Sequence, residues 1–251
     1  MMLNRLTSYV MISLAGICLL SSQAFPEQSF HFTSEIDTPT AYTIGRGTYN
    51  LSLWGYDQGG VEFKAYIGLH DYFYLGASFD VEHAIGKEKP HANIPGVVAK
   101  IKFTDGWETF PISVAIGYDS FYIGTPGKYK DDDNDAANRM IYGPYFVITK
   151  PIYLLNSEQH ISGGIRVPAQ PKFVAKDTAY FASLDIPLGK YFTLKGETER
   201  IYYNLHRPKD WLFNAGMQYS FLMKFGVEFD IICQRHERVN RVIRVEYSDA
   251  F

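Results

Sequence analysis

Apolar and polar side chains alternate along much of this chain, most regularly in one stretch of its first half. Apolar residues occupy every second position of 61–69 and again of 73–81, while Glu62, Lys64 and Asp80 lie on the opposite face. A period of two residues predicts β-strands with one apolar and one polar face. Each run is about as long as a tilted strand that crosses a bilayer. The stretch therefore predicts an antiparallel pair of membrane-spanning strands.

The same unit recurs through the chain and predicts about twelve strands. The expected strands are 46–56, 61–69, 73–82, 95–104, 112–118, 140–149, 160–167, 180–186, 191–201, 211–219, 225–231 and 239–247. Shorter connections, one of them of about nine residues beginning at Lys150–Pro151, alternate with polar loops, the longest of which is Tyr122–Arg139. Short turns on one side and longer loops on the other are typical of barrels from bacterial outer membranes.

These patterns favour an all-β fold, a transmembrane antiparallel up-and-down β-barrel of about 12 strands, within a range of about 10–14. We expect the barrel to occupy residues 45–251. Residues 25–44 lack regular alternation until their end, and we expect them to form a periplasmic N-terminal lead-in. The domain order is then a signal peptide, a short lead-in and one barrel.

Residues 1–24 have the features of a cleavable signal peptide. Arg5 supplies the basic start, residues 11–20 are apolar, and small residues precede the expected cleavage site. A lipoprotein signal at Cys18 is the weaker alternative, because the residue before it is larger than is usual there. The expected location is the bacterial outer membrane, reached by export through this cleavable signal.

The composition agrees with a barrel. Aromatic residues make up 16% of the chain, charged residues only 20%, and the formal net charge is −3. This weak acidic bias, without a basic run, argues against nucleic-acid binding. Aromatic rings should form two girdles at the strand ends, with Tyr72 and Tyr74 in one and Trp54, Tyr56 and Tyr118 in the other. A soluble β-sandwich with an aromatic core is the alternative, but it does not explain rings at strand ends.

The polar faces of the expected strands define the candidate site, because in a barrel they point into the lumen. The charged residues expected to line a pore are Lys64, Asp80, Glu82, Lys100, Lys102, Arg166, Lys195, Glu197, Glu228, Asp230, Arg244 and Glu246. Mixed charges can form a selective route for small solutes, or they can pair with one another and plug the lumen. Twelve strands lie between the filled interior of small barrels and the open channel of large ones, so size does not decide.

Four stretches resemble one group of bacterial proteins. They are residues 36–41 (IDTPTA), 76–78 (GAS), 95–100 (PGVVAK) and 111–120 (PISVAIGYDS). Over residues 36–121 the chain resembles a large, poorly characterised group of bacterial outer-membrane β-barrel proteins similar to the YjbH exopolysaccharide-associated barrels. The resemblance implies the barrel fold and the outer membrane, and by analogy a link to exopolysaccharide. Its motifs belong to the barrel wall and imply no catalytic residue.

Two loop features offer ligands for a metal ion. Lys130–Asp135 clusters carboxylates that suit Ca²⁺, but it lacks the glycine and the distal glutamate of an EF-hand. Four histidines without close ligand spacing fall in loops on the same side, namely His83, His91, His206 and His236. A solvated acidic loop and surface histidines explain these features, so we expect no metal and no other cofactor.

Candidate groups for catalysis are few. Ser120 beside Asp119, and Ser162 near His160, offer parts of a hydrolase, but neither serine occurs in a nucleophile elbow or a triad motif. Cys233 fits an inert apolar position in a strand better than a nucleophile. We therefore expect no enzyme activity.

The function that this sequence favours is a narrow pore for small polar solutes. The alternative is a non-conducting envelope barrel with a structural role, or one whose outer loops contact polysaccharide, lipid or a host partner. The expected partners are outer-membrane lipid and lipopolysaccharide, the barrel-assembly machinery during insertion, and a small polar solute. A terminal aromatic residue, Phe251, suits recognition by the assembly machinery.

Overall fold

The computed structural model describes residues 33–93, 95–107, 110–120, 143–154, 157–167, 178–201, 210–222, 224–234 and 239–251. The expected signal peptide at 1–24 lies outside these residues, as do Lys130–Asp135, His206 and His236. Within the described residues, no helix is long and apolar enough to cross a membrane.

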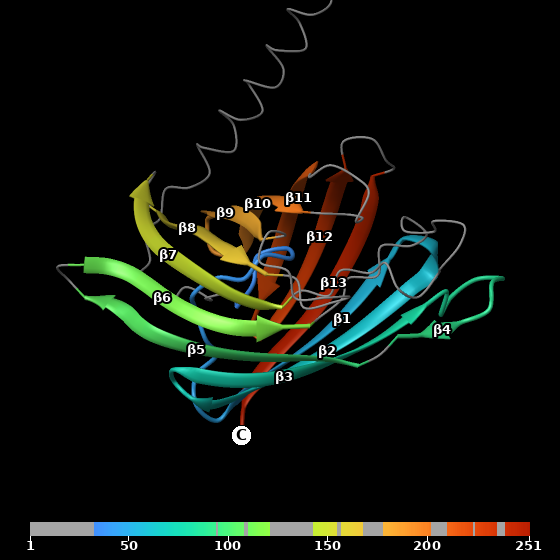
Figure 1. The fold of residues 1–251 in the computed structure, drawn as a ribbon, viewed down its shortest axis with the longest axis horizontal. Coiled ribbons are helices and arrows are strands. Elements are labelled where there is room, and N and C mark those ends of the chain that lie inside the picture. Colours follow the sequence, from blue (N-terminus) through green and yellow to red (C-terminus); the bar gives the residue numbers. More distant parts are fainter. Residues whose placement is uncertain are drawn as a thin grey trace, which may run out of the picture.

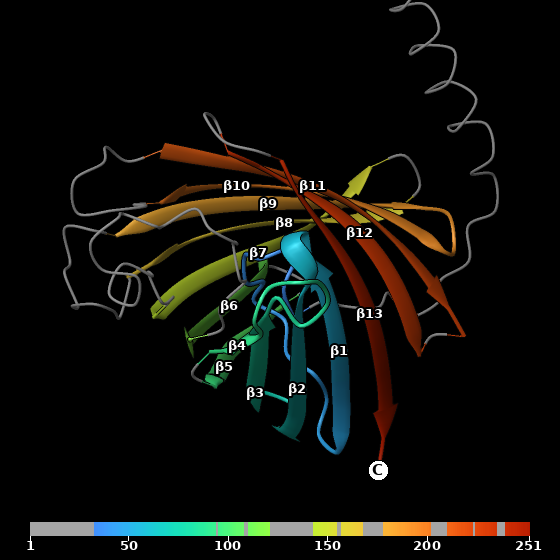
Figure 2. The same ribbon diagram turned by 90° about the vertical axis from the view of Figure 1, so that its right-hand side faces the viewer.

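Twelve long strands form one closed barrel, seen from two directions in Figures 1 and 2. They are β1 (Thr48–Tyr56), β2 (Gly60–His70), β3 (Phe73–Glu82), β5 (Gly96–Trp107), β6 (Phe110–Asp119), β7 (Pro144–Leu154), β8 (Ser157–Arg166), β9 (Ala179–Leu188), β10 (Phe192–Ile201), β11 (Asp210–Phe221), β12 (Phe225–Gln234) and β13 (Asn240–Ala250). A short additional strand, β4 (His91–Ala92), pairs with the end of β3. Neighbouring strands are antiparallel, and β1 pairs with β13 from Thr48 opposite Ala250 to Gly55 opposite Ile243. That last pairing closes the sheet, so the expected up-and-down barrel is confirmed.

Short and long connections alternate around the barrel. The hairpins β2–β3, β5–β6, β7–β8, β9–β10 and β11–β12 are each joined by two or three residues at one end. At the other end the connections are longer, except after β1, where the 3₁₀ turn η1 (Asp57–Gly59) leads directly into β2. This is the alternation that the polar loops in the sequence indicated.

The strand β7 is longer than we expected. A connection was expected at Lys150–Pro151, but β7 continues through it and pairs Pro151 with His160 on β8. The pairing of β7 with β6 ends at Thr149 opposite Ser113. Pro151 therefore lies where β7 has a partner on one side, a place where a residue without an amide hydrogen fits in a sheet. The expected break at this proline was wrong.

The barrel is apolar outside and charged inside. On β2, Phe63 exposes 43% of its surface while the adjacent Lys64 exposes 3%; on β13, Ile243 exposes 54% and Arg244 exposes 1%. This is the reverse of a soluble protein, and it is what a barrel surrounded by lipid requires. A β-sandwich would bury the apolar rows instead, so that alternative does not describe this fold.

Three rings expected in the girdles point into the barrel instead. Trp54, Tyr56 and Tyr74 are at most 6% exposed. Trp54 is paired with Glu62 on β2 and with Arg244 on β13, which places its side chain on the charged face. A position near a strand end suggested a girdle, but the alternation along the strand decides which way a side chain points. The girdle residues that face outward as expected include Tyr72 and Tyr118.

Candidate functional site: the lumen and the hairpin inside it

The predicted pore-lining residues lie on the inner face of the barrel. Ten of them are at most 8% exposed, so protein atoms rather than open water surround them. These ten are Lys64, Asp80, Glu82, Lys100, Arg166, Lys195, Glu197, Glu228, Asp230 and Arg244. The other two are nearer to solvent: Lys102 pairs with Asp105, and Glu246 lies 3.4 Å from Arg244.

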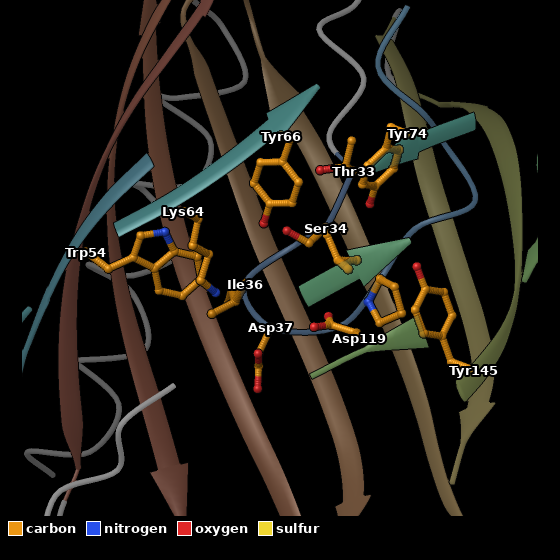
Figure 3. Close-up of a pocket in the computed structure, with 12 residues that line it drawn as sticks. Thr33, Ser34, Ile36, Asp37, Trp54, Lys64, Tyr66, Tyr74, Asp119 and Tyr145 are labelled. Atoms are coloured by element: carbon orange, nitrogen blue, oxygen red, sulfur yellow. The ribbon is translucent and has the colours of Figure 1, made fainter. Parts of the chain in front are cut away.

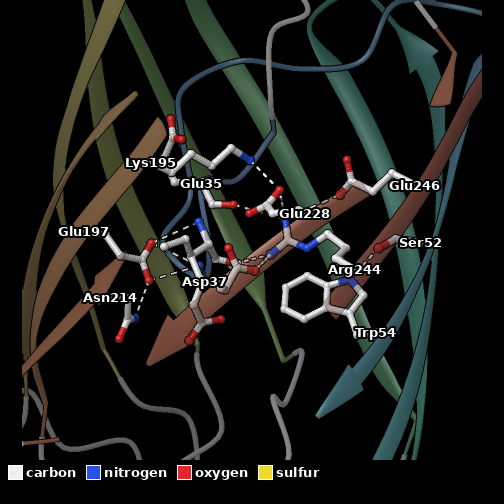
Figure 4. Close-up of polar contacts among 12 residues, drawn as sticks. Glu35, Asp37, Ser52, Trp54, Lys195, Glu197, Asn214, Glu228, Arg244 and Glu246 are labelled. Atoms are coloured by element: carbon white, nitrogen blue, oxygen red, sulfur yellow. Dashed lines mark hydrogen bonds and ion pairs between the residues drawn. The ribbon is translucent and has the colours of Figure 1, made fainter. Parts of the chain in front are cut away.

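A folded piece of the chain itself fills the lumen ahead of β1. Residues 33–40 form what we call the inner hairpin, whose tip is Ile36–Asp37. Glu35 N donates to Thr38 O at 2.9 Å, and Thr40 N donates to Thr33 O at 3.2 Å. The side chains near the tip are almost completely buried, with Ile36 and Thr38 at 0% exposure. Figure 4 shows the hairpin between the walls of the barrel.

The chain leaves the lumen at the end with the short turns. Thr43 Oγ1 donates to Asp71 O at 2.6 Å, and Arg46 N donates to Asp71 Oδ1 at 2.9 Å, which fixes the exit beside the β2–β3 turn. We expected a periplasmic lead-in over residues 25–44, but the described part of that range runs through the barrel. Residues without strand pairing can lie there because the charged wall satisfies their backbone groups.

Glu197, in the middle of β10, binds the tip of the inner hairpin. Its carboxylate accepts hydrogen bonds from three consecutive amides, those of Ile36 at 3.2 Å, Asp37 at 3.0 Å and Thr38 at 2.9 Å. The Thr38 hydroxyl donates to the same carboxylate at 2.8 Å. Asn214 Nδ2 on β11 donates to its other oxygen at 2.6 Å and so holds it in position. Successive amides turned toward one anion form a strong, charge-assisted site.

Cations of the wall bind the carbonyl groups of the same segment. Lys100 Nζ donates to the carbonyls of residues 33, 40 and 42 at 2.7, 2.8 and 3.1 Å, which uses all three of its hydrogens. Arg244 donates to the carbonyls of residues 35 and 36 at 3.1 and 2.5 Å. Arg166 Nη2 donates to the carbonyl of residue 37 at 3.1 Å. Glu197 therefore holds the amides of the tip while two arginines hold its carbonyls.

Arg244 is itself fixed by a network across the lumen (Figure 4). Lys195 pairs with Glu228 at 2.7 Å, and Glu228 lies 3.5 Å from Arg244. The guanidinium of Arg244 lies 3.6 Å from the centre of the Trp54 ring, and Lys64 Nζ lies 3.7 Å from it. An inward tryptophan between two cations stabilises both through its ring faces.

One acidic group of the inner hairpin has an unusual proton affinity. Complete burial raises the pKa of Glu35 from 4.5 to about 8. Lys195 opposes this shift, while nearby carboxylates add to it: Asp185, Glu228 and Glu197. The docked hairpin therefore binds a proton more tightly than a hairpin in water.

The space left around the inner hairpin is small. A cavity of about 20 Å³ remains between it and strands β1 to β7, which is room for about one water molecule (Figure 3). Aromatic rings make up much of the wall here, among them Tyr66, Tyr74 and Tyr145. Gly117 on β6 allows the last of these rings to lie inward, because a Cβ there would approach it to 2.4 Å. Where this cavity lies, the described residues of the hairpin and the wall leave no room for a larger solute.

Two of the other candidate groups, His160 and Ser162, have structural partners. His160 Nδ1 lies 3.0 Å from Asp185 and Nε2 lies 3.4 Å from Glu158, while the Ser162 hydroxyl shares a hydrogen bond of 2.8 Å with Thr149. Among the described residues, no group of three or more His, Cys, Asp or Glu side chains could hold a metal ion.

Alternation located the charged wall but did not reveal the inner hairpin or the inward aromatic rings. The hairpin residues have no strand period, and the hydrogen bonds between their backbone and the charged side chains of the wall join positions at least 60 apart in the sequence. The available signal was the inward set of charges, since so many charges in one lumen need partners. The alternation of inward and outward side chains along β1 and β3 would have placed the three inward rings correctly.

A closed antiparallel barrel with an apolar exterior and an ionic interior defines this chain as a transmembrane β-barrel. Solved structures with the same fold include two of a KdgM porin and one of an outer-membrane channel from Pseudomonas putida F1. One KdgM porin structure matches with TM-score 0.55 and 13% identity over 80% of this chain and 98% of that chain. The other, in complex with disordered oligogalacturonate, gives 0.54 and 10% over 81% and 99%.

The Pseudomonas channel gives TM-score 0.51 and 11% identity over 86% of this chain and all of that one, 100%. No family model and no curated protein matches the chain. At such identities the similarity concerns the fold, and it confirms the outer-membrane kind of barrel that the sequence indicated. The narrower resemblance to YjbH-like barrels remains a prediction.

Proposed function

We propose that the chain is an outer-membrane channel for small polar solutes and that its inner hairpin closes it. The observation that carries the proposal is the non-covalent docking of the hairpin against an ionic wall. Withdrawal of residues 33–42 would leave a passage lined by charged and aromatic side chains, as in polar pores. The shared fold with porins and with a channel supports this function.

The charge of the wall favours cations and neutral solutes over anions. Among the described residues, the buried wall carries eight carboxylates against five Lys or Arg side chains. The carboxylates are Glu62, Asp80, Glu82, Asp185, Glu197, Glu199, Glu228 and Asp230, and the cations are Lys64, Lys100, Arg166, Lys195 and Arg244. Rings of Asp and Glu select cations in other pores. A polyanion such as the oligogalacturonate bound by the KdgM porin would meet repulsion here.

Recording in planar bilayers tests this proposal. We expect the full chain to conduct rarely and a variant that lacks residues 33–42 to give discrete conductance steps. Its reversal potential in a salt gradient should show a preference for cations. Lys100→Glu with Lys102→Glu should increase that preference, and because Lys100 holds the hairpin, the same pair should open the full chain.

The folded state of each sample is checked by its heat-dependent mobility on a gel. A correctly folded deletion variant that stays silent would contradict the channel and favour the second candidate function, a non-conducting envelope barrel. The closed lumen is the observation that favours this alternative. The resemblance to YjbH-like barrels would then direct attention to exopolysaccharide, with the acidic loop Lys130–Asp135 as a contact; its deletion should change surface binding and leave the barrel folded.

Localisation in the outer membrane, through the expected signal at 1–24, is part of the same proposal. The apolar belt requires a lipid environment, which supports the proposed contact with outer-membrane lipid and lipopolysaccharide. We propose that the barrel-assembly machinery inserts the chain and recognises its C-terminal strand, which ends beside the aromatic Phe251.

A further inference from the structure

We infer that the inner wall is a binding site for polypeptide main chain, and that short peptides are ligands of the lumen when the inner hairpin has withdrawn. Access of such ligands rests on the proposed function, but the site itself does not. The hairpin is the occupant that the structure shows, so its contacts describe the chemistry that the wall recognises.

The wall binds backbone atoms that every peptide possesses. Glu197 accepts from three successive amides, those of residues 36, 37 and 38. Arg244 binds the carbonyls of residues 35 and 36, and Arg166 binds the carbonyl of residue 37. The wall therefore binds both the amide and the carbonyl of three consecutive peptide groups, with an anion for the amides and cations for the carbonyls.

The wall groups are also positioned by other residues of the wall. Arg244 lies against the ring of Trp54, and Glu197 accepts a hydrogen bond from Asn214. A sugar has hydroxyl groups but no row of amides to occupy the carboxylate, and an anionic group placed directly against Glu197 would be repelled by it. A peptide satisfies both kinds of group, because its donors and acceptors alternate.

The amide hydrogens can be tested one at a time. The probe is a fluorescent peptide with the sequence of residues 33–42, TSEIDTPTAY, added to the detergent-folded variant that lacks those residues. Binding is measured by fluorescence anisotropy. A second peptide replaces the amide of Thr38 by an ester, which removes one hydrogen that Glu197 accepts and leaves the side chains unchanged. We expect the ester to bind roughly tenfold more weakly, because a hydrogen bond to an ion is lost.

Matched variants of the wall complete the test. Glu197→Gln should weaken binding of the amide peptide by roughly tenfold and reduce the difference in affinity between the amide and ester peptides. Ser183→Ala should leave both affinities unchanged, since Ser183 is buried directly opposite Glu197 on β9 and its hydroxyl has no hydrogen-bond partner among the described residues. Tetra-alanine should displace the probe, while the trisaccharide raffinose should not.

Should the deletion variant fail to fold, a protease site inserted at residues 43–46 allows the hairpin to be cut after folding and exchanged for labelled peptide. Equal binding of ester and amide, or displacement by raffinose as readily as by tetra-alanine, would overturn the inference. Peptide binding without conductance would defeat the channel and keep the peptide site. Conductance without peptide binding would keep the channel and defeat the peptide site.

Discussion

Lys100 shows what a single inward side chain contributes to the closed state. Its ammonium is fully buried and is satisfied by three carbonyls from two parts of the segment, at residues 33, 40 and 42. A buried ammonium without such partners would be very unfavourable, so the contact stabilises the lysine as well as the hairpin. Two positions further along β5, Lys102 pairs with Asp105 instead.

This pair of lysines gives a matched prediction. Lys100→Met should release the segment and raise its rate of cleavage by added protease at least roughly tenfold, because hydrogen bonds to a charged group contribute about 1.5–3 kcal/mol. Lys102→Met should leave that rate near the value of the unchanged protein. Cleavage products are identified by mass, and heat-dependent mobility confirms that the barrel remains folded. Equal rates in the two variants would show that Lys100 does not hold the segment.

At the scale of elements, the inner hairpin is a small structure that depends on its surroundings. Its own hydrogen bonds are few, and the strands β5, β8, β10 and β13 supply the rest through side chains. An element of this kind docks or withdraws as a unit, since its parts have little independent stability. Its docking should therefore respond to any group whose charge changes on burial.

Glu35 makes that response depend on pH. Its pKa is raised to about 8 in the docked hairpin, against 4.5 for an ordinary glutamate. The docked state thus binds the proton of Glu35 more tightly than the withdrawn state does. Protonation of Glu35 therefore stabilises docking fully below pH 4.5, and this stabilisation is lost as the pH rises toward about 8. Cleavage of the hairpin should increase roughly tenfold or more between pH 5.5 and 8.5.

Glu35→Gln is the control for this prediction, since glutamine keeps the shape and does not titrate. In this variant most of the increase in cleavage rate with pH should disappear. Any part of the increase that is due to His160, whose ring lies beside Tyr42, would persist. Rates are compared with those of a free peptide of the same sequence, which removes the pH dependence of the protease. An unchanged pH profile in Glu35→Gln would rule out this residue as the source.

At the scale of the whole molecule, the apolar exterior decides where the protein can be stable. Two valines allow a direct test, because Val245 in the middle of β13 and Val239 just before that strand are both 44% exposed. Val245→Arg should destabilise the barrel in lipid vesicles by about 2–4 kcal/mol, as expected for a cation inside the hydrocarbon layer. Val239→Arg should leave the free energy of unfolding in vesicles nearly unchanged. Urea unfolding in vesicles measures both, and equal effects would mean that no lipid belt distinguishes the two positions.

The exterior and the strands could be predicted from the sequence because both follow from a local period of two. Phe63 and Lys64 belong to opposite faces whatever their partners are, and the register of one hairpin carries this assignment to the next. The docking of Ile36 against Glu197 could not be predicted in this way. It joins two residues that are 161 positions apart in the sequence, and no local pattern encodes that distance.

The contact between Arg244 and the inner hairpin has a consequence for how the barrel is built. Arg244 belongs to β13, the last strand, yet it holds the carbonyls of residues 35 and 36, which precede β1. The seam between β1 and β13 is the pairing that closes the sheet. We therefore expect the hairpin to tie the two margins of the sheet to each other from within and to help them into register as the barrel closes. A chain without residues 33–42 should reach the same barrel more slowly, because its seam has to find that register by itself.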